Sequence, residues 1–198
     1  MSLRHSYTVI APLYDALLAT AGTGVRAASL GQMPQQGELN VLISGIGSGL
    51  DLPYLPPCHH YVGLDLTAAM LRRAKSRTGS LRLSLIQGNS MSLPFTDGTF
   101  DHVVLHLILA IVPDATACLR ETARVLKPGG SVLILDKFLK PGESAWGRRI
   151  LNLLSQHIVT RLDVVFEQVL VDVPELKVEE DVPVLAGGWF RRIRLVKL

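Results

Sequence analysis

The sequence predicts an α/β fold built on a mainly parallel sheet, and three observations lead to that prediction. Strand-like and helix-like patterns alternate through most of the 198 residues. Residues 100–107 form a near-continuous apolar run, which is typical of a central strand covered by helices on both faces. Hydrophobic residues make up 48% of the chain and charged residues 19%, so the chain can bury a sizeable core and is not a disordered segment.

Each expected element is bounded by a change of pattern or by a turn residue. Thr67 serves as the N-cap of one helix, Pro113 and Asp114 open a second, and Lys127-Pro128-Gly129-Gly130 ends it. Helical spacing also covers residues 145–171. Apolar or alternating runs predict strands over residues 39–44, 61–66, 81–87, 100–107, 131–136, 176–182 and 189–196, the last two joined as a hairpin.

The chain is predicted to be one domain, residues 1–198, with a helical preface before its core. Val9, Leu13 and Leu17 recur at four-residue intervals, as on one face of a helix. A connector rich in glycine, proline and glutamine follows, so the preface covers residues 1–36 and the α/β core residues 37–198.

Composition and motif content exclude several classes of protein. No apolar stretch approaches the roughly 18 residues of a membrane span, and Pro12 and Asp15 interrupt the amino-terminal segment where a signal peptide needs an apolar run. Cys58 and Cys118 are too far apart and too isolated for a disulfide framework or a zinc site, which is typical of the reducing cytoplasm. The net charge is +3, but the basic residues are scattered apart from residues 191–197, so we expect a solvated face there and no nucleic-acid partner.

A glycine-rich turn follows the first predicted strand and is the most informative motif. Gly45, Gly47 and Gly49 alternate, which permits a tight turn and a close approach of the backbone to a ligand. We expect a helix to follow and to offer free N–H groups. Sixteen residues beyond Gly49, at the end of the second strand, Asp65 can accept hydrogen bonds from both hydroxyls of a ribose. Together these features predict an adenosine-containing cofactor.

A nicotinamide cofactor fits the glycine turn less well. Its fingerprint requires glycine or alanine at the sixth position counted from Gly45, and that position is Leu50. A nicotinamide-dependent oxidoreductase therefore remains only as an alternative function.

Five further motifs, in order, accompany the glycine turn, and with them the chain resembles the class I S-adenosylmethionine-dependent methyltransferases, type-11 group. Residues 49–56 look most like bacterial phosphatidylethanolamine N-methyltransferases and ubiquinone/menaquinone-biosynthesis methyltransferases. The resemblance implies S-adenosyl-L-methionine as the cofactor, no metal, and a Rossmann-like, doubly wound, mostly parallel seven-stranded sheet with an antiparallel C-terminal strand. The motifs are Tyr7 to Tyr14-Asp15, Gly45-Ile46-Gly47-Ser48-Gly49, Gly63-Leu64-Asp65, Gln87-Gly88-Asn89-Ser90-Met91-Ser92-Leu93-Pro94-Phe95, Phe100-Asp101 and Leu126-Lys127-Pro128-Gly129-Gly130.

The resemblance also implies roles for individual residues. The glycine turn would lie under the methionine part of the cofactor, Asp65 would hold the ribose, and the segment 89–91 would meet the adenine. The cofactor-binding residues implied in this way are Ser44, Gly45, Gly47, Gly49, Asp65, Leu66, Met70, Asn89, Ser90, Met91, Leu105 and Tyr14.

Ser44 departs from the family pattern, which commonly has a carboxylate at the residue that opens the glycine motif. A serine hydroxyl can form a hydrogen bond but cannot neutralise the methionine ammonium. Either another residue compensates for this change, or the chain is a degenerate S-adenosylmethionine-binding protein without turnover.

His106 is the candidate catalytic residue, because an imidazole suits proton removal at neutral pH. The alternative is a histidine in an apolar strand whose ring is merely hydrogen-bonded. Leu105, His106 and Lys137, from the ends of the fourth and fifth strands, and Tyr14, from the preface, are expected to face the methyl acceptor.

We expect the acceptor to be a small or lipid-like molecule, with the acceptor atom and the oligomeric state left open. Residues 148–170 combine Arg148, Arg149 and Arg161 with many leucines. This segment could cover an apolar substrate or contact an anionic membrane surface, and its alternative is a plain core-facing helix.

Overall fold

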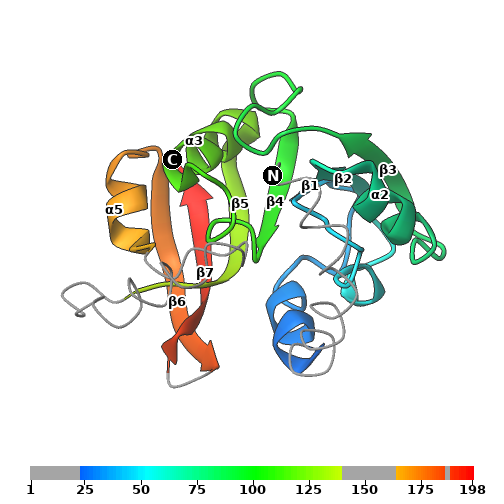
Figure 1. Ribbon diagram of the computed structural model, residues 1–198, viewed down its shortest axis with the longest axis horizontal. Coiled ribbons are helices and arrows are strands. Elements are labelled where there is room, and N and C mark those ends of the chain that lie inside the picture. Colours follow the sequence, from blue (N-terminus) through cyan, green and yellow to red (C-terminus); the bar gives the residue numbers. More distant parts are fainter. Residues whose placement is uncertain (1–22, 140–163, 186–187) are drawn as a thin grey trace, which may run out of the picture.

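The computed structural model describes residues 23–139, 164–185 and 188–198. It contains a seven-stranded sheet in the order β3-β2-β1-β4-β5-β7-β6 (Figure 1). Only β7 runs antiparallel to its neighbours β5 and β6, and the other pairs are parallel. The predicted fold class is therefore confirmed, including its antiparallel C-terminal strand. The strands are β1 (Asn40–Ser44), β2 (His60–Asp65), β3 (Arg82–Gln87), β4 (Phe100–His106), β5 (Leu126–Lys137), β6 (Leu176–Leu185) and β7 (Phe190–Lys197).

Helices cover both faces of the sheet, as the apolar run of β4 predicts. Val103 and Leu105 pack into the core that β4 shares with α3 (Ala115–Val125) and α5 (Phe166–Val171). Val104 points the other way, into a core that includes Leu30 from the helix of residues 23–30 and Ala74 from α2 (Ala68–Lys75). The period-2 alternation of a strand thus divides one apolar run between two hydrophobic layers.

The predicted start of α3 is close to the observed one, whereas the start of β5 differs. The side chain of Asp114 accepts a hydrogen bond from the Ala117 N–H at 2.9 Å and so caps α3. β5 begins five residues earlier than expected, at Leu126, because the glycine segment continues the strand after a register shift beside β4. At Gly130 a Cβ atom would lie 2.8 Å from the Asp101 carbonyl oxygen, so the two strands approach closely there.

The helix expected after the glycine turn is absent, and this prediction was wrong. The chain forms instead a single 3₁₀ turn, η1 (Leu52–Tyr54). Pro53, Pro56 and Pro57 lack the N–H groups that a longer helix would need at those positions. Any backbone donors for a ligand must therefore come from the turn itself.

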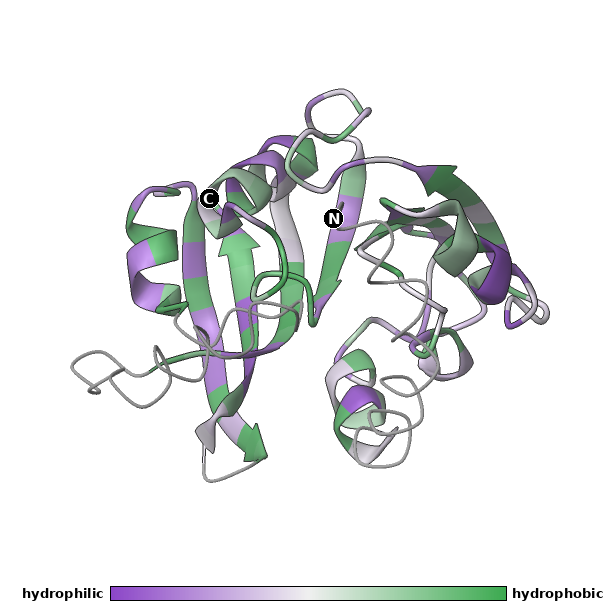
Figure 2. Cartoon of the chain, viewed as in Figure 1, coloured by the Kyte–Doolittle hydropathy of each residue, from purple (hydrophilic) through white to green (hydrophobic). Residues whose placement is uncertain are grey.

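The basic residues of the last strand are paired rather than simply solvated. Arg192 lies 2.8 Å from Glu180, Arg194 lies 3.0 Å from Glu179, and Arg191 pairs with Asp181, all across the β6–β7 hairpin. β6 has three consecutive hydrophilic residues, Glu179, Glu180 and Asp181, with hydrophobic residues towards both ends (Figure 2). These cross-strand ion pairs join the arginines of β7 to the carboxylates of β6.

Two predicted segments lie wholly or partly outside the described residues. Of the preface, residues 1–22 with Tyr14 are not described, and residues 23–30 are helical. Of the segment 145–171, the described part contributes α5. No helix among the described residues is long and apolar enough to cross a membrane.

Candidate functional site

A pocket of about 220 Å³ opens at the carboxyl ends of β1 to β4. The strand order reverses between β1 and β4, and such switch points are where open α/β sheets bind ligands. The pocket is lined by Arg26, Gly45, Ile46, Gly47, Ser48, Leu50, Asp51, Asp65, Leu66, Thr67, Met70, Asn89, Ser90, Met91, His106, Leu107, Ile108, Ile111, Val112 and Pro113.

The glycine turn forms the floor of the pocket. Gly45 (φ +76°) and Gly47 (φ +57°) have left-handed backbone conformations that favour glycine. A Cβ atom on Gly45 would lie 2.6 Å from the Ile108 side chain, whereas one on Gly47 would meet nothing within 4 Å. The backbone of Gly47 is therefore open to a ligand. Gly49 does not line the pocket, and a Cβ atom there would press on Leu52.

Asp65 ends β2 and is held by three hydrogen bonds. The Gly47 N–H donates to Oδ2 at 2.9 Å, while the N–H and the hydroxyl of Thr67 donate to Oδ1 at 2.9 and 3.1 Å. Burial raises the pKa of this carboxyl, and the three hydrogen bonds oppose that rise. Because a carboxylate has about four lone-pair sites, Oδ2 retains the capacity to accept from a ligand.

The wall beyond Asp65 combines apolar side chains with a tight turn. Leu66 lines the pocket and is 47% exposed, which leaves an apolar surface for a flat ligand to cover. The Asn89 side chain accepts from the Met91 N–H at 3.0 Å and closes a turn. Ser90 accepts a hydrogen bond from the Ser44 hydroxyl at 2.8 Å.

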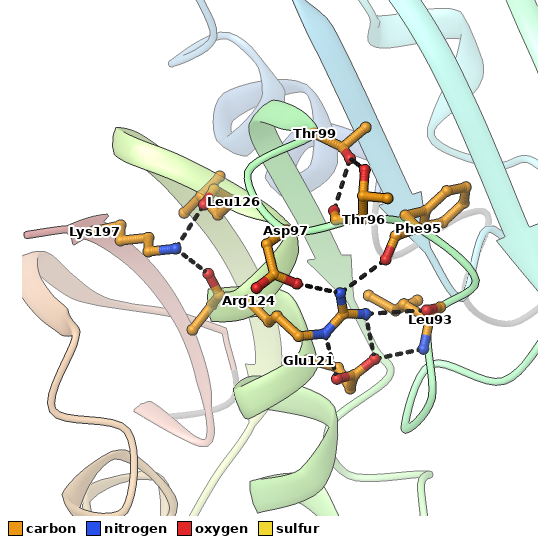
Figure 3. A network of polar contacts seen from close by, with 10 residues as sticks. Leu93, Phe95, Thr96, Asp97, Thr99, Glu121, Arg124, Leu126 and Lys197 are labelled. Carbon is orange, nitrogen blue, oxygen red and sulfur yellow. Dashed lines mark hydrogen bonds and ion pairs between the residues drawn. The ribbon is translucent and has the colours of Figure 1, made fainter.

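A network centred on Arg124 fixes the chain that follows this wall (Figure 3). Its guanidinium donates to the carbonyls of Leu93 and Phe95 at 3.1 and 2.8 Å, and to both carboxylate oxygens of Glu121. Glu121 in turn accepts from the Leu93 N–H at 2.7 Å. Together these bonds tie the segment after Met91 to α3, so the wall rests on a helix rather than on a free loop.

The carboxyl end of β4 is strained where it meets the pocket. Leu107 has φ +57°, and it is the one non-glycine residue with positive φ among those that the structure describes. Its N–H donates to the Leu135 carbonyl at 2.8 Å, which holds the turn to β5. Backbone strain of this kind is concentrated at functional sites.

A buried polar cluster in the wall of the pocket connects three segments of the chain. Arg26, from the helix of residues 23–30, donates to Asp51 Oδ1 at 2.6 Å. His106 Nδ1 lies 3.1 Å from the same oxygen, without the angle of a good hydrogen bond, and His106 Nε2 lies 3.0 Å from the Ser29 hydroxyl. Burial opposes ionisation of Asp51, but His106 and Arg26 outweigh it and lower its pKa to about 2.

The cluster resembles a hydrolytic triad in the order and spacing of Ser29, His106 and Asp51. It differs because its serine is not accessible to a substrate. Ser29 has no exposed surface and does not line the pocket. A nucleophile must reach its substrate, so the cluster does not support acyl transfer.

The pocket collects most, but not all, of the residues implied by the sequence. Leu105 lies in the α3 side of the core, because strand alternation turns it away from the pocket that its neighbour His106 lines. Neither Ser44 nor Lys137 lines the pocket, and Tyr14 lies outside the described residues. The implied residues that do line it are Gly45, Gly47, Asp65, Leu66, Met70, Asn89, Ser90, Met91 and His106.

Sequence reasoning missed two charged residues of the pocket, Arg26 and Asp51. Asp51 stands between two leucines in the sequence. A single carboxylate among apolar residues is the sequence feature that could have identified it as a buried charged residue. Nothing in the local pattern marks Arg26. Within the described residues, no three histidine, cysteine or carboxylate side chains gather as a metal site would require.

Known proteins resemble this chain in sequence and in fold. The family model described as "Methyltransferase domain" matches residues 42–134. Phosphatidylethanolamine N-methyltransferase of Cereibacter sphaeroides is 33% identical over 159 residues, which cover 78% of each chain. Demethylmenaquinone methyltransferase of Bacillus licheniformis is 48% identical over 75 residues, 37% of this chain and 32% of that protein. The crystal structure of a SAM-dependent methyltransferase of Thermotoga maritima superposes with a TM-score of 0.73 at 19% identity, covering 99% of this chain and 100% of that one.

Proposed function

Because this chain belongs to the family of S-adenosylmethionine-dependent methyltransferases, we propose that it transfers the methyl group to a lipid-like or quinone-like acceptor. The enzyme class and the cofactor follow from family membership. The nature of the acceptor, the roles of the pocket residues and the place of action are the proposal.

The pocket fits the cofactor through three features. Because Gly47 has no side chain, the cofactor can approach the backbone there closely. Asp65 retains the capacity to accept a hydrogen bond from a ribose hydroxyl. The apolar surface of Leu66 and Met70 suits the faces of an adenine, with Asn89 to Met91 at its edge. In this assignment the methionine part lies over the glycine turn, towards β4.

The bound cofactor supplies a methyl group that a sulfonium already activates. The protein must hold the acceptor in line behind that methyl carbon and exclude water. Such positioning contributes up to about 7–11 kcal/mol to lowering a reaction barrier.

The acceptor assignment is carried by the apolar segment after β4. It lines the pocket on the side where the methyl group would lie and offers hydrocarbon surface without a charged group. That surface suits an acceptor with a long apolar part, in agreement with the lipid and quinone substrates named for the two relatives. The segment consists of Leu107, Ile108, Ile111, Val112 and Pro113.

We propose that His106 positions its neighbours and does not abstract a proton. Its side chain is buried, one ring nitrogen contacts Ser29, and the other faces Asp51. Nε2 is therefore already hydrogen-bonded, and Nδ1 lies 3.1 Å from the Asp51 carboxylate before an acceptor arrives. This geometry favours the hydrogen-bonded histidine over the general base.

Methyl transfer to a panel of acceptors tests the function. The protein is incubated with radiolabelled cofactor and with phosphatidylethanolamine vesicles, a demethylated menaquinone or ethanolamine. We expect label in one of the two apolar acceptors, loss of it in Asp65→Ala, and retention in Asp101→Asn, whose carboxylate lies at the other end of β4. Transfer to ethanolamine alone would contradict the lipid-like acceptor.

A lipid-like acceptor implies action at a membrane surface, and we propose that the protein works in the cytoplasm with peripheral membrane contact. Each Lys or Arg near an anionic surface contributes about 1 kcal/mol to binding. Co-sedimentation with anionic vesicles should therefore be strong at low salt and weak at high salt. Absence of binding at low salt would contradict this contact.

A further inference from the structure

Ser44 cannot supply the negative charge that the family commonly has at its position. The residue is almost fully buried, and its hydroxyl donates to Ser90 rather than facing the pocket. A methionine ammonium bound over the glycine turn would therefore need another counter-charge.

Arg26 and Asp51 both line the pocket, although they are only 7% and 4% exposed. A single hydrogen bond of 2.6 Å, from Nη1 to Oδ1, joins them. Among the described residues, neither the other carboxylate oxygen of Asp51 nor the Nε and Nη2 atoms of Arg26 have a hydrogen-bond partner. Buried charged groups normally fill all their hydrogen bonds, so within the described part of the chain both members of this pair keep capacity for a ligand.

We propose that Arg26 and Asp51 together bind the amino-acid end of the cofactor, Asp51 contacting the ammonium and Arg26 the carboxylate. This inference rests on the proposed binding of the cofactor in the pocket. An α-amino acid carries one cation and one anion on the same carbon, and an adjacent carboxylate and guanidinium match that pair with charge neutrality. Asp51 thus replaces the carboxylate that Ser44 lacks.

His106 and Arg26 fix the direction of the Asp51 carboxylate. Both contact Oδ1, from the end of β4 and from the helix of residues 23–30 respectively. With Oδ1 engaged on both sides, Oδ2 is left for a ligand. The cluster therefore prepares the site before the cofactor binds, which reduces the cost of ordering it.

Two ligands separate this role from a structural one. S-adenosylhomocysteine carries the amino-acid end, and 5′-methylthioadenosine lacks it. By isothermal titration, Asp51→Asn should bind S-adenosylhomocysteine about 10–100-fold more weakly, as expected for loss of a charge-assisted bond, and bind methylthioadenosine within about threefold of the unmodified protein. Asp101→Asn, the same change at the far end of β4, should leave both affinities unchanged.

Arg26 is tested with decarboxylated S-adenosylhomocysteine, which keeps the ammonium only. Arg26→Gln should weaken binding of S-adenosylhomocysteine by about tenfold, as expected for the loss of one hydrogen bond to a charged group. The affinity for the decarboxylated ligand should not change. Should a single variant fail to fold, the double variant Asp51→Asn/Arg26→Gln removes both charges. It should lose S-adenosylhomocysteine binding while retaining methylthioadenosine.

The outcomes distinguish this inference from the function on which it rests. Equal weakening of both ligands in Asp51→Asn, or unchanged binding of S-adenosylhomocysteine, would overturn the assignment of Asp51. If the unmodified protein binds neither ligand, the proposed cofactor site itself is wrong.

Discussion

Asp51, which lines the pocket, and Asp136, near the end of β5, are both buried carboxylates, yet their pKa values shift in opposite directions. Asp51 faces Arg26 and His106, and its pKa falls to about 2 despite burial. Asp136 accepts hydrogen bonds from the backbone N–H groups of Ala110 and Lys137. Burial raises its pKa to about 6 because those bonds only partly offset the loss of water. The kind of partner, not the depth, decides the charge of a buried carboxylate.

The largest expected effect comes from removing the carboxylate of Asp51. In Asp51→Ala the Arg26 guanidinium stays buried without a counter-charge, so the free energy of unfolding should fall by about 3–5 kcal/mol. Urea denaturation measures this loss. Asp51→Leu/Arg26→Met, which removes both charges, should recover most of it, and a loss below 1 kcal/mol in the single variant would show that solvent reaches Arg26.

The free energy of unfolding should depend on pH in opposite directions for the two carboxylates, Asp136 and Asp51. The folded protein holds the Asp136 proton more tightly than an unfolded chain does, where the pKa is near 3.8. Stability from that proton is full below about pH 4 and is lost as the pH rises through about 6, a decrease of about 2–3 kcal/mol in the free energy of unfolding. Urea denaturation between pH 4.5 and 7 should show this decline in the unmodified protein and not in Asp136→Asn, at roughly these magnitudes.

The contribution of Asp51 to stability changes with pH in the opposite direction to that of Asp136, so the two carboxylates can be compared in one protein. Its folded pKa lies below its usual value of 3.8, so its contribution is present above about pH 4 and disappears as the pH falls towards 2. A stability that rises from pH 4.5 to 7 would contradict the assignment of Asp136.

Asp65 is the second carboxylate that lines the pocket, and it lies between these two cases. Within the described residues it has hydrogen-bond donors and no paired cation, and its pKa is raised by burial. Asp65→Ala should weaken binding of S-adenosylmethionine by about 1.5–3 kcal/mol, since charge-assisted hydrogen bonds to the ribose are lost. Titration calorimetry on the folded variant measures the change, and an unaltered affinity would remove Asp65 from the ribose site.

Ser44→Glu gives the smallest expected effect and tests whether the pocket already has its counter-charge. If Asp51 fills that role, a second carboxylate is redundant and breaks the hydrogen bond to Ser90. Cofactor affinity should then decrease about fivefold, near 1 kcal/mol. Tighter binding would mean that the missing carboxylate at this position is uncompensated.

The sequence predicts local features of the site well and long-range ones poorly. The glycine turn, Asp65 and the cap at Asp114 follow from residue type and spacing alone, and the structure places each as expected. The 3₁₀ turn η1 differs from prediction because its prolines outweigh the tendency of such loops to open a helix.

Contacts between distant segments leave no local pattern to read. Arg26 meets Asp51 across 25 positions, and Ser29 meets His106 across 77. The docking of the helix of residues 23–30 on the sheet brings them together, through buried side chains such as Leu30. The polar cluster could therefore be identified only once the tertiary packing was known.

The β6–β7 hairpin has a consequence for self-association. β6 is an edge strand, and an edge with free N–H and C=O groups is a template for aggregation. Its pairing with β7 shifts register twice, between Val178 and Glu180 and between Pro183 and Leu185, and Pro183 offers no N–H to a neighbour. An irregular edge of this kind resists the addition of a second strand, so copies of the enzyme at high concentration would not join into fibrils along β6.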